Sequence, residues 1–149
     1  MVIENIKNQK SVSLPYLFVY GTLMRESLSK IDPILVKHTT FITRAKAQGQ
    51  LYLIERADGS FNYPGLILSD HQDHIVHGEL FRVGNAKRLF EILNQYEECS
   101  PTCPKPHEYR RGIIAVKRPD QTTLKAVTYI YNRAVENLQL IESGSFHEI

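Results

Sequence analysis

Apolar residues along this chain occur in short runs and in alternation with polar residues, which is the pattern of β-strands. The pattern predicts strands over residues 16–20, 44–54, 63–68, 75–83, 109–117 and 126–131, and a short helix or strand over 138–141. In residues 75–83 both alternating faces carry apolar side chains, so we expect this strand to be buried on two sides. In residues 109–117 we expect Ile113 and Ala115 to pack inward, with Val116 as a further candidate.

One segment repeats its apolar residues at helical spacing. It starts after Asn85, a suitable N-cap, and follows the i, i+3, i+4, i+7 pattern of an amphipathic helix. Its apolar stripe consists of Ala86, Leu89, Phe90 and Leu93. Because Pro33 interrupts residues 25–38, we expect this segment to form a short, broken helix or a structured loop. About six strands with one or two helices, not regularly alternating, predict an α+β fold.

The end of the predicted helix carries two acidic residues with different expected environments. Because successive helical residues turn by about 100°, Glu97 falls within the apolar stripe and Glu98 falls outside it. An inward carboxylate at a helix C-terminus is desolvated and faces the negative end of the helix dipole, and both effects raise its pKa. Such a group suits general acid–base catalysis near neutrality. The alternative is that the helix frays and Glu97 faces water.

The first predicted strand ends at a glycine followed by a hydroxyl residue. Gly21 permits a positive φ and lets another group approach the backbone closely. The amides of Gly21, Thr22 and Leu23 could then point outward as a nest for an anion or a carbonyl oxygen. The alternative is a buried strand that ends in a purely structural turn.

The composition is that of an ordinary globular protein, with 42% hydrophobic and 23% charged residues among 149. We expect a single domain over residues 15–149, preceded by a polar tail over residues 1–14. The 18 basic and 16 acidic residues leave a net charge of +2, which predicts no nucleic-acid or membrane partner. The absence of a long apolar run and of a signal-peptide core leads us to expect a cytoplasmic protein.

Two groups of residues have spacings that occur in metal sites. They are His71, His74 and His77, and Cys99, Cys103 and His107. The first group lies partly in a predicted turn, and no helix places its three side chains together. The second lies in a proline-rich loop without an evident fourth ligand. We therefore expect no metal, and we expect the two cysteines to be free thiols in a reducing compartment.

Five short motifs occur in a fixed order along the chain. They are Val19-Tyr20-Gly21-Thr22-Leu23, Tyr63-Pro64-Gly65-Leu66, Gly78-Glu79-Leu80, Tyr96-Glu97 and Tyr109-Arg110-Arg111. This series resembles the γ-glutamylcyclotransferase-like family, which includes the AIG2-like and YtfP-like proteins, over about residues 16–132. The resemblance implies a small mixed β-barrel with one or two helices packed on its outside.

The resemblance also implies roles for residues near the predicted helix end. The family's helix ends in a Leu-Asp-x-Tyr-Glu-Gly motif whose glutamate is the acid–base catalyst, and that glutamate corresponds to Glu97. Asn94 replaces the aspartate, and Glu98 replaces the glycine, where it could change the turn and the aim of Glu97. The family's Tyr-x-Arg motif corresponds to Tyr109 and Arg111.

The remaining implied roles concern binding and support. The implied substrate-binding residues are Tyr20, Gly21, Thr22, Leu23 and Tyr109. Glu79 lies in a strand that looks buried and needs a partner, for which Arg111 and Tyr20 are candidates, so Glu79 and Arg111 are assigned supporting roles. Core packing of Tyr109 and a structural salt bridge of Arg111 are the alternatives.

The activity implied by the resemblance is cyclisation of a γ-glutamyl amine or peptide to 5-oxoproline, with release of the amine. Such a reaction asks for no metal or organic cofactor, and its partner is a small γ-glutamyl molecule. We expect a monomer or a weak homodimer. A non-catalytic binding protein that keeps the cavity is an alternative, favoured by Glu98, and a preference for γ-glutamylamines is another.

Overall fold

The computed structural model describes residues 16–21, 37–55, 62–84, 88, 91 and 108–146. These residues form seven strands: β1 (Tyr16–Val19), β2 (Thr39–Glu55), β3 (Asn62–Leu68), β4 (Ile75–Val83), β5 (Tyr109–Lys117), β6 (Thr123–Tyr131) and β7 (Gln139–Ile141). Across these ranges, no helix has both the length and the apolar character that a membrane crossing requires.

The strand pattern of the sequence is confirmed, with two strands longer than predicted by three residues or more. β2 begins at Thr39 rather than at residue 44, and β6 begins at Thr123 rather than at residue 126. The added part of β2 is rich in Thr and other β-formers and pairs with β4 through a register shift between Phe41 and Thr43. Residues 139–141 form a strand rather than a helix, because they pair with β2.

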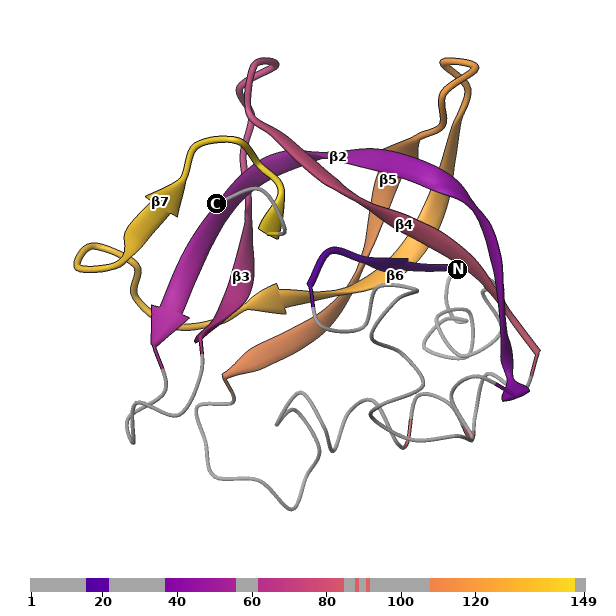
Figure 1. Cartoon of the computed structure of the whole chain (residues 1–149), viewed down its shortest axis with the longest axis horizontal. Coiled ribbons are helices and arrows are strands. Elements are labelled where there is room, and N and C mark those ends of the chain that lie inside the picture. The colour runs from indigo at the N-terminus through magenta and orange to yellow at the C-terminus, as the bar shows by residue number, and fades with distance from the viewer. Residues whose placement is uncertain are drawn as a thin grey trace.

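Five strands close into a mixed barrel in the order β2-β4-β1-β6-β5. The only parallel pairing among the described strands joins β1 to β6, where Leu17 lies opposite Val127. Closure comes from a short antiparallel contact of β2 with β5, in which Ala47 lies opposite Val116. The far half of β2 extends past the barrel and carries β3 on one side and β7 on the other (Figure 1). The small mixed barrel that the resemblance implied is therefore confirmed.

The helices of the expected α+β fold are not tested by the described residues. The apolar stripe of the predicted helix lies outside them. Arg88 and Glu91 are described as helical and exposed, with 3.9 Å between Nη1 of Arg88 and Oε1 of Glu91. Their positions agree with a polar outer helix face, while the packing of the helix stays a prediction.

The barrel interior is filled by alternate residues from all five barrel strands. Small and large side chains share it, with Phe18 from β1, Ala45 from β2 and Leu80 from β4 among its buried members. The intervening residues of β1, β4, β5 and β6 form a second buried cluster on the outer face. This outer cluster is aromatic at one end, where Tyr109 and Tyr131 belong to it. β4 is buried on both faces near its centre, as its sequence predicts.

The expected inward face of β5 was wrong. Ile114 and Val116 are buried in the barrel interior, whereas Ile113 is 45% exposed and Ala115 is exposed. The pairing of Val116 with Ala47 fixes this orientation, because residues directly opposite in a ladder project from the same face. Only the weaker candidate, Val116, was correctly placed inward.

β1 and β4 approach each other so closely that one position requires glycine. A Cβ atom at Gly78 would lie 2.3 Å from the carbonyl oxygen of Val19 and 2.6 Å from Cζ of Phe18. The first neighbour is backbone within a paired strand, and Phe18 is almost fully buried. Neither can move without disturbing the barrel.

We expect Gly78→Ala to lower the free energy of unfolding by about 1 to 3 kcal/mol, since overpacking a filled core forces the backbone to shift. Gly84→Ala is the matched control, because a Cβ there would meet only the carbonyl oxygen of His38 at 3.6 Å. Urea denaturation of both variants measures the difference. Equal stability of the two would contradict the described contact.

Candidate functional site

The turn after β1 lies against the start of β3. A Cβ atom at Gly21 would lie 2.5 Å from Cγ and 3.0 Å from Cδ of Pro64. Gly144 is the only described glycine with a positive φ, so Gly21 is required by this close approach and not by a left-handed backbone. The structure thus supports one of the two reasons that the sequence suggested for a glycine here.

The Tyr20 side chain fixes this turn from inside the barrel. Its hydroxyl donates a hydrogen bond to the carbonyl oxygen of Tyr129 on β6. The same hydroxyl accepts one, at 3.3 Å, from the amide of Leu66 on β3. Tyr20 is 6% exposed. The hydroxyl thus links β6 to β3, and the substrate-binding role of Tyr20 stays a prediction.

Tyr109, the first residue of β5, contacts the same proline. Its hydroxyl donates a hydrogen bond of 2.7 Å to the carbonyl oxygen of Pro64. Its ring stands edge-on to Tyr131, with 5.6 Å between ring centroids, and lies 6.5 Å from the ring of Tyr63. The structure therefore brings together Gly21 and Tyr109, two predicted site residues separated by most of the chain, at Pro64.

Glu108 is a buried acidic residue beside this junction that the sequence analysis missed. It is 6% exposed and accepts a hydrogen bond from the Tyr63 hydroxyl. Its carbonyl oxygen accepts a bond of 2.7 Å from the amide of Asn132. The sequence carries little signal for it, because an acidic residue after a proline-rich stretch of sequence is ordinarily exposed.

The charge of this carboxylate acts on Tyr131. Burial raises the pKa of the Tyr131 phenol above its ordinary value of 10.0, the negative charge of Glu108 adds to the rise, and the positive charge of Arg133 opposes it. The neutral phenol is thus favoured in the folded protein.

The two predicted supporting residues lie on different strands of the barrel. Glu79 is 6% exposed on β4, directly opposite Val19 of β1 and Arg44 of β2. Arg111 lies on β5, opposite Tyr129. The register therefore places Arg44 across from Glu79, whereas Arg111 lies on a strand that does not pair with β4. The predicted residues Thr22, Leu23 and Glu97 lie outside the described residues, and their roles stay predictions.

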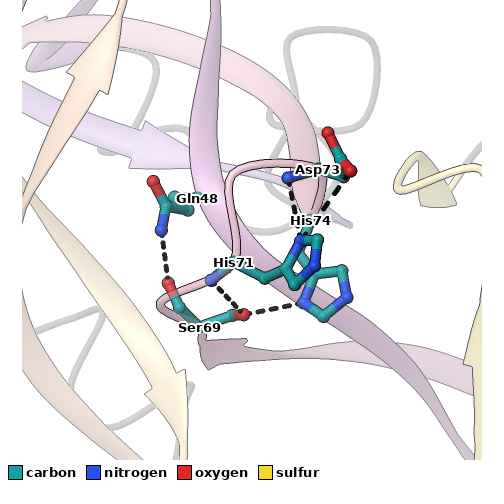
Figure 2. A network of polar contacts seen from close by, with 5 residues as sticks. All are labelled: Gln48, Ser69, His71, Asp73 and His74. Atoms are coloured by element: carbon teal, nitrogen blue, oxygen red, sulfur yellow. Dashed lines mark hydrogen bonds and ion pairs between the residues drawn. The ribbon is translucent and has the colours of Figure 1, made fainter.

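The three histidines considered as metal ligands lie in and after the turn between β3 and β4. Figure 2 shows Nδ1 of His71 accepting a hydrogen bond of 3.2 Å from the amide of Asp73. The Oγ of Ser69 bonds Nδ1 of His74 at 2.7 Å, and the two imidazole rings stack 4.6 Å apart. An Nδ1 that accepts an amide proton leaves the ring proton on Nε2, so neither nitrogen of neutral His71 offers a lone pair to a metal.

The amide of His77 donates to the carbonyl oxygen of Gly144 at 2.8 Å, and its side chain is exposed. Among the described residues, no three His, Cys, Asp or Glu side chains are grouped as a metal site. The cysteine-containing group lies outside those residues.

A protein-family model described as gamma-glutamyl cyclotransferase, AIG2-like, matches residues 17–148. No curated protein sequence matches the chain.

Solved structures share the fold at low sequence identity. An AIG2-like protein from Mus musculus has a TM-score of 0.63 and 24% identity, over 87% of this chain and 86% of that one. YkqA from Bacillus subtilis has a TM-score of 0.62 and 22% identity over 91% of this chain, which spans only 40% of the length of YkqA. A structure of gamma-glutamyl cyclotransferase has a TM-score of 0.60 and 15% identity, over 84% of this chain and 68% of that one.

We expect the raised pKa of Tyr131 to make stability depend on alkaline pH. A raised folded-state pKa contributes stability that is fully present below the unfolded value of 10.0 and is lost as pH rises through the folded value. Tyr131→Phe should therefore flatten the fall of the unfolding free energy above pH 10.0, measured by urea denaturation across pH.

Glu108→Gln provides the check on the cause. Removing the negative charge of Glu108 should lower the pKa of Tyr131. That pKa is measured from the tyrosinate absorbance of Glu108→Gln minus that of the double variant Glu108→Gln/Tyr131→Phe, across pH. An unchanged or higher pKa in Glu108→Gln would show that the carboxylate does not act on the phenol.

Proposed function

Because the chain belongs to the gamma-glutamyl cyclotransferase, AIG2-like family, we propose that it cyclises a γ-glutamyl amine or peptide to 5-oxoproline and releases the amine. The observation that carries the proposal is the convergence of three family-like motifs at one place. Gly21 packs on Pro64, and Tyr109 donates a hydrogen bond to the carbonyl oxygen of that proline. These residues come from separate parts of the chain, so their meeting reflects the fold rather than sequence proximity.

The reaction is an intramolecular acyl transfer. The α-amino nitrogen of the γ-glutamyl group attacks its own γ-carbonyl carbon, which forms the ring C–N bond and gives a tetrahedral intermediate with an oxyanion. Collapse of the intermediate breaks the original C–N bond. In all, the ring nitrogen gives up two protons and the leaving nitrogen takes up two, so a neutral lactam and a protonated amine are released. The protein must hold the chain of the substrate in a folded attack geometry, move the protons and stabilise the oxyanion.

Glu97 is the residue proposed to move the protons. It takes a proton from the substrate ammonium group, which frees the nucleophilic lone pair, and returns one to the leaving amine. The family resemblance of the helix end and the inward position of Glu97 on the helical wheel support this role.

The turn after β1 is proposed to bind the polar end of the substrate through the amides of residues 21–23. The packing of Gly21 on Pro64 and the two hydrogen bonds of the Tyr20 hydroxyl support this role, because they hold the start of the turn in one position. Backbone donors held in this way need no reorganisation when the oxyanion forms.

A non-catalytic binding protein is the second candidate. The observation that favours it is Glu98, which stands where the family often has glycine after its catalytic glutamate. A side chain at this position can change the turn and turn Glu97 away from the substrate.

We expect Glu97→Gln to bind γ-glutamyl compounds but to lose turnover, because an amide cannot accept and return a proton. The loss should be about 10²- to 10⁴-fold, the usual contribution of a general acid–base group. The measurement is mass-spectrometric detection of 5-oxoproline released from a panel of γ-glutamyl peptides and amines, with each variant checked by thermal melting.

Glu98→Gln is the neighbouring control, since the helical wheel places it outside the apolar stripe and we expect its activity to stay near that of the wild type. Equal turnover by the wild type and Glu97→Gln would remove Glu97 from the mechanism. Binding of a γ-glutamyl compound by all three proteins without 5-oxoproline from any of them would favour the non-catalytic candidate.

A further inference from the structure

Glu108 has a carboxylate oxygen that the described residues leave unused. The Tyr63 hydroxyl donates to Oε2, but no described residue forms a hydrogen bond or ion pair with Oε1. Glu108 is only 6% exposed. A buried carboxylate is costly unless it is paired, and an ionised carboxylate offers about four acceptor positions. One donor therefore leaves most of its hydrogen-bonding capacity open.

The neighbours of Glu108 are aromatic rather than basic. The Tyr63 hydroxyl donates a hydrogen bond to the Glu108 carboxylate, and the negative charge of that carboxylate contributes to the raised pKa of Tyr131. Tyr109, the next residue, packs edge-on against Tyr131. Arg133 acts electrostatically on Tyr131, but no ion pair joins it to Glu108 among the described residues. The surroundings of Glu108 thus combine one negative charge with neighbouring aromatic side chains.

This combination matches one class of ligand. An organic ammonium group carries a positive charge and N–H donors for the open carboxylate oxygen, and it is attracted to the faces of aromatic rings. A divalent metal ion is a poorer match, because the described residues offer no group of three metal-binding side chains. We propose that Glu108, with the rings of Tyr63 and Tyr131 beside it, is a binding site for an organic ammonium group.

The position of the site relates it to the proposed reaction. Tyr63 adjoins Pro64, and Glu108 adjoins Tyr109, which donates to the carbonyl oxygen of that proline. The ammonium site therefore borders the place where Gly21 packs. On the proposed function, on which this assignment of the ligand rests, the ammonium is either the α-amino group of the γ-glutamyl moiety or a second amine on the acceptor.

The first experiment tests the site without any γ-glutamyl compound. The probes are n-butylammonium and its neutral analogue n-butanol, titrated into wild-type protein with the ring resonances of Tyr63 and Tyr131 followed by NMR. We expect n-butylammonium to shift both rings with saturation and n-butanol to leave them largely unchanged. Absence of a saturable shift with n-butylammonium, or an equal response to both probes, would overturn the proposal.

Glu108→Gln tests the charge. We expect n-butylammonium to bind about 10- to 100-fold more weakly, the usual loss when a hydrogen bond to a charged group is removed. Glu108→Asp should recover part of this affinity, because it restores the negative charge. Glu136→Gln removes an exposed carboxylate and should leave the affinity unchanged. Unchanged n-butylammonium affinity in Glu108→Gln, or a loss shared equally by Glu136→Gln, would overturn the proposal.

A second pair of probes identifies the ammonium group that the site accepts. The γ-glutamyl monoamide of a diamine and that of the matching n-alkylamine are compared by calorimetric titration of the wild type and Glu108→Gln. A loss confined to the diamine derivative assigns the site to the acceptor amine, whereas an equal loss assigns it to the α-amino group. If both affinities stay unchanged, the site does not bind substrate. If the wild type releases no 5-oxoproline from any γ-glutamyl compound, the proposed reaction is refuted, but the n-butylammonium titration still tests the ammonium site.

Discussion

The contact between Gly21 and Pro64 is the constraint on which the candidate site depends. It brings the end of β1 against the start of β3 at a distance that no side chain at residue 21 could occupy. The hydroxyl of Tyr109 holds the same proline through its carbonyl oxygen, and the hydroxyl of Tyr20 ties the neighbouring backbone of β3 to β6. Three segments that are distant in the sequence are thereby fixed relative to one another.

The strands were predictable because most of them combine β-forming residues with clear boundaries at Gly, Pro or polar turns. The orientation of β5 was not, since apolar residues occupy both of its alternating faces, as Ile113 and Ile114 show. Only the pairing of Val116 with Ala47 decides which face is inside. Barrel closure depends on such long-range pairings, and local periodicity contains no information about them.

The candidate site was predictable where a short motif marks it. Gly21, Pro64 and Tyr109 could each be identified from a motif, but no sequence pattern shows that the three motifs meet. Glu108 escaped notice because its burial arises from tertiary contact with Tyr63, which no sequence spacing reveals. For Glu97 the sequence predicts a position on a helix, but the residue lies outside the described ranges, so the structure does not test it.

The central proposal is that the turn at Gly21 and the aromatic residues beside Pro64 together bind the γ-glutamyl group. Titration of isotope-labelled protein with 5-oxoproline, followed by NMR, tests it most directly. The account predicts that the Gly21 amide and the Tyr63 and Tyr109 rings shift together with one dissociation constant. Saturable shifts confined to other surfaces, such as the turn that carries His71, with no change at Gly21, would contradict it.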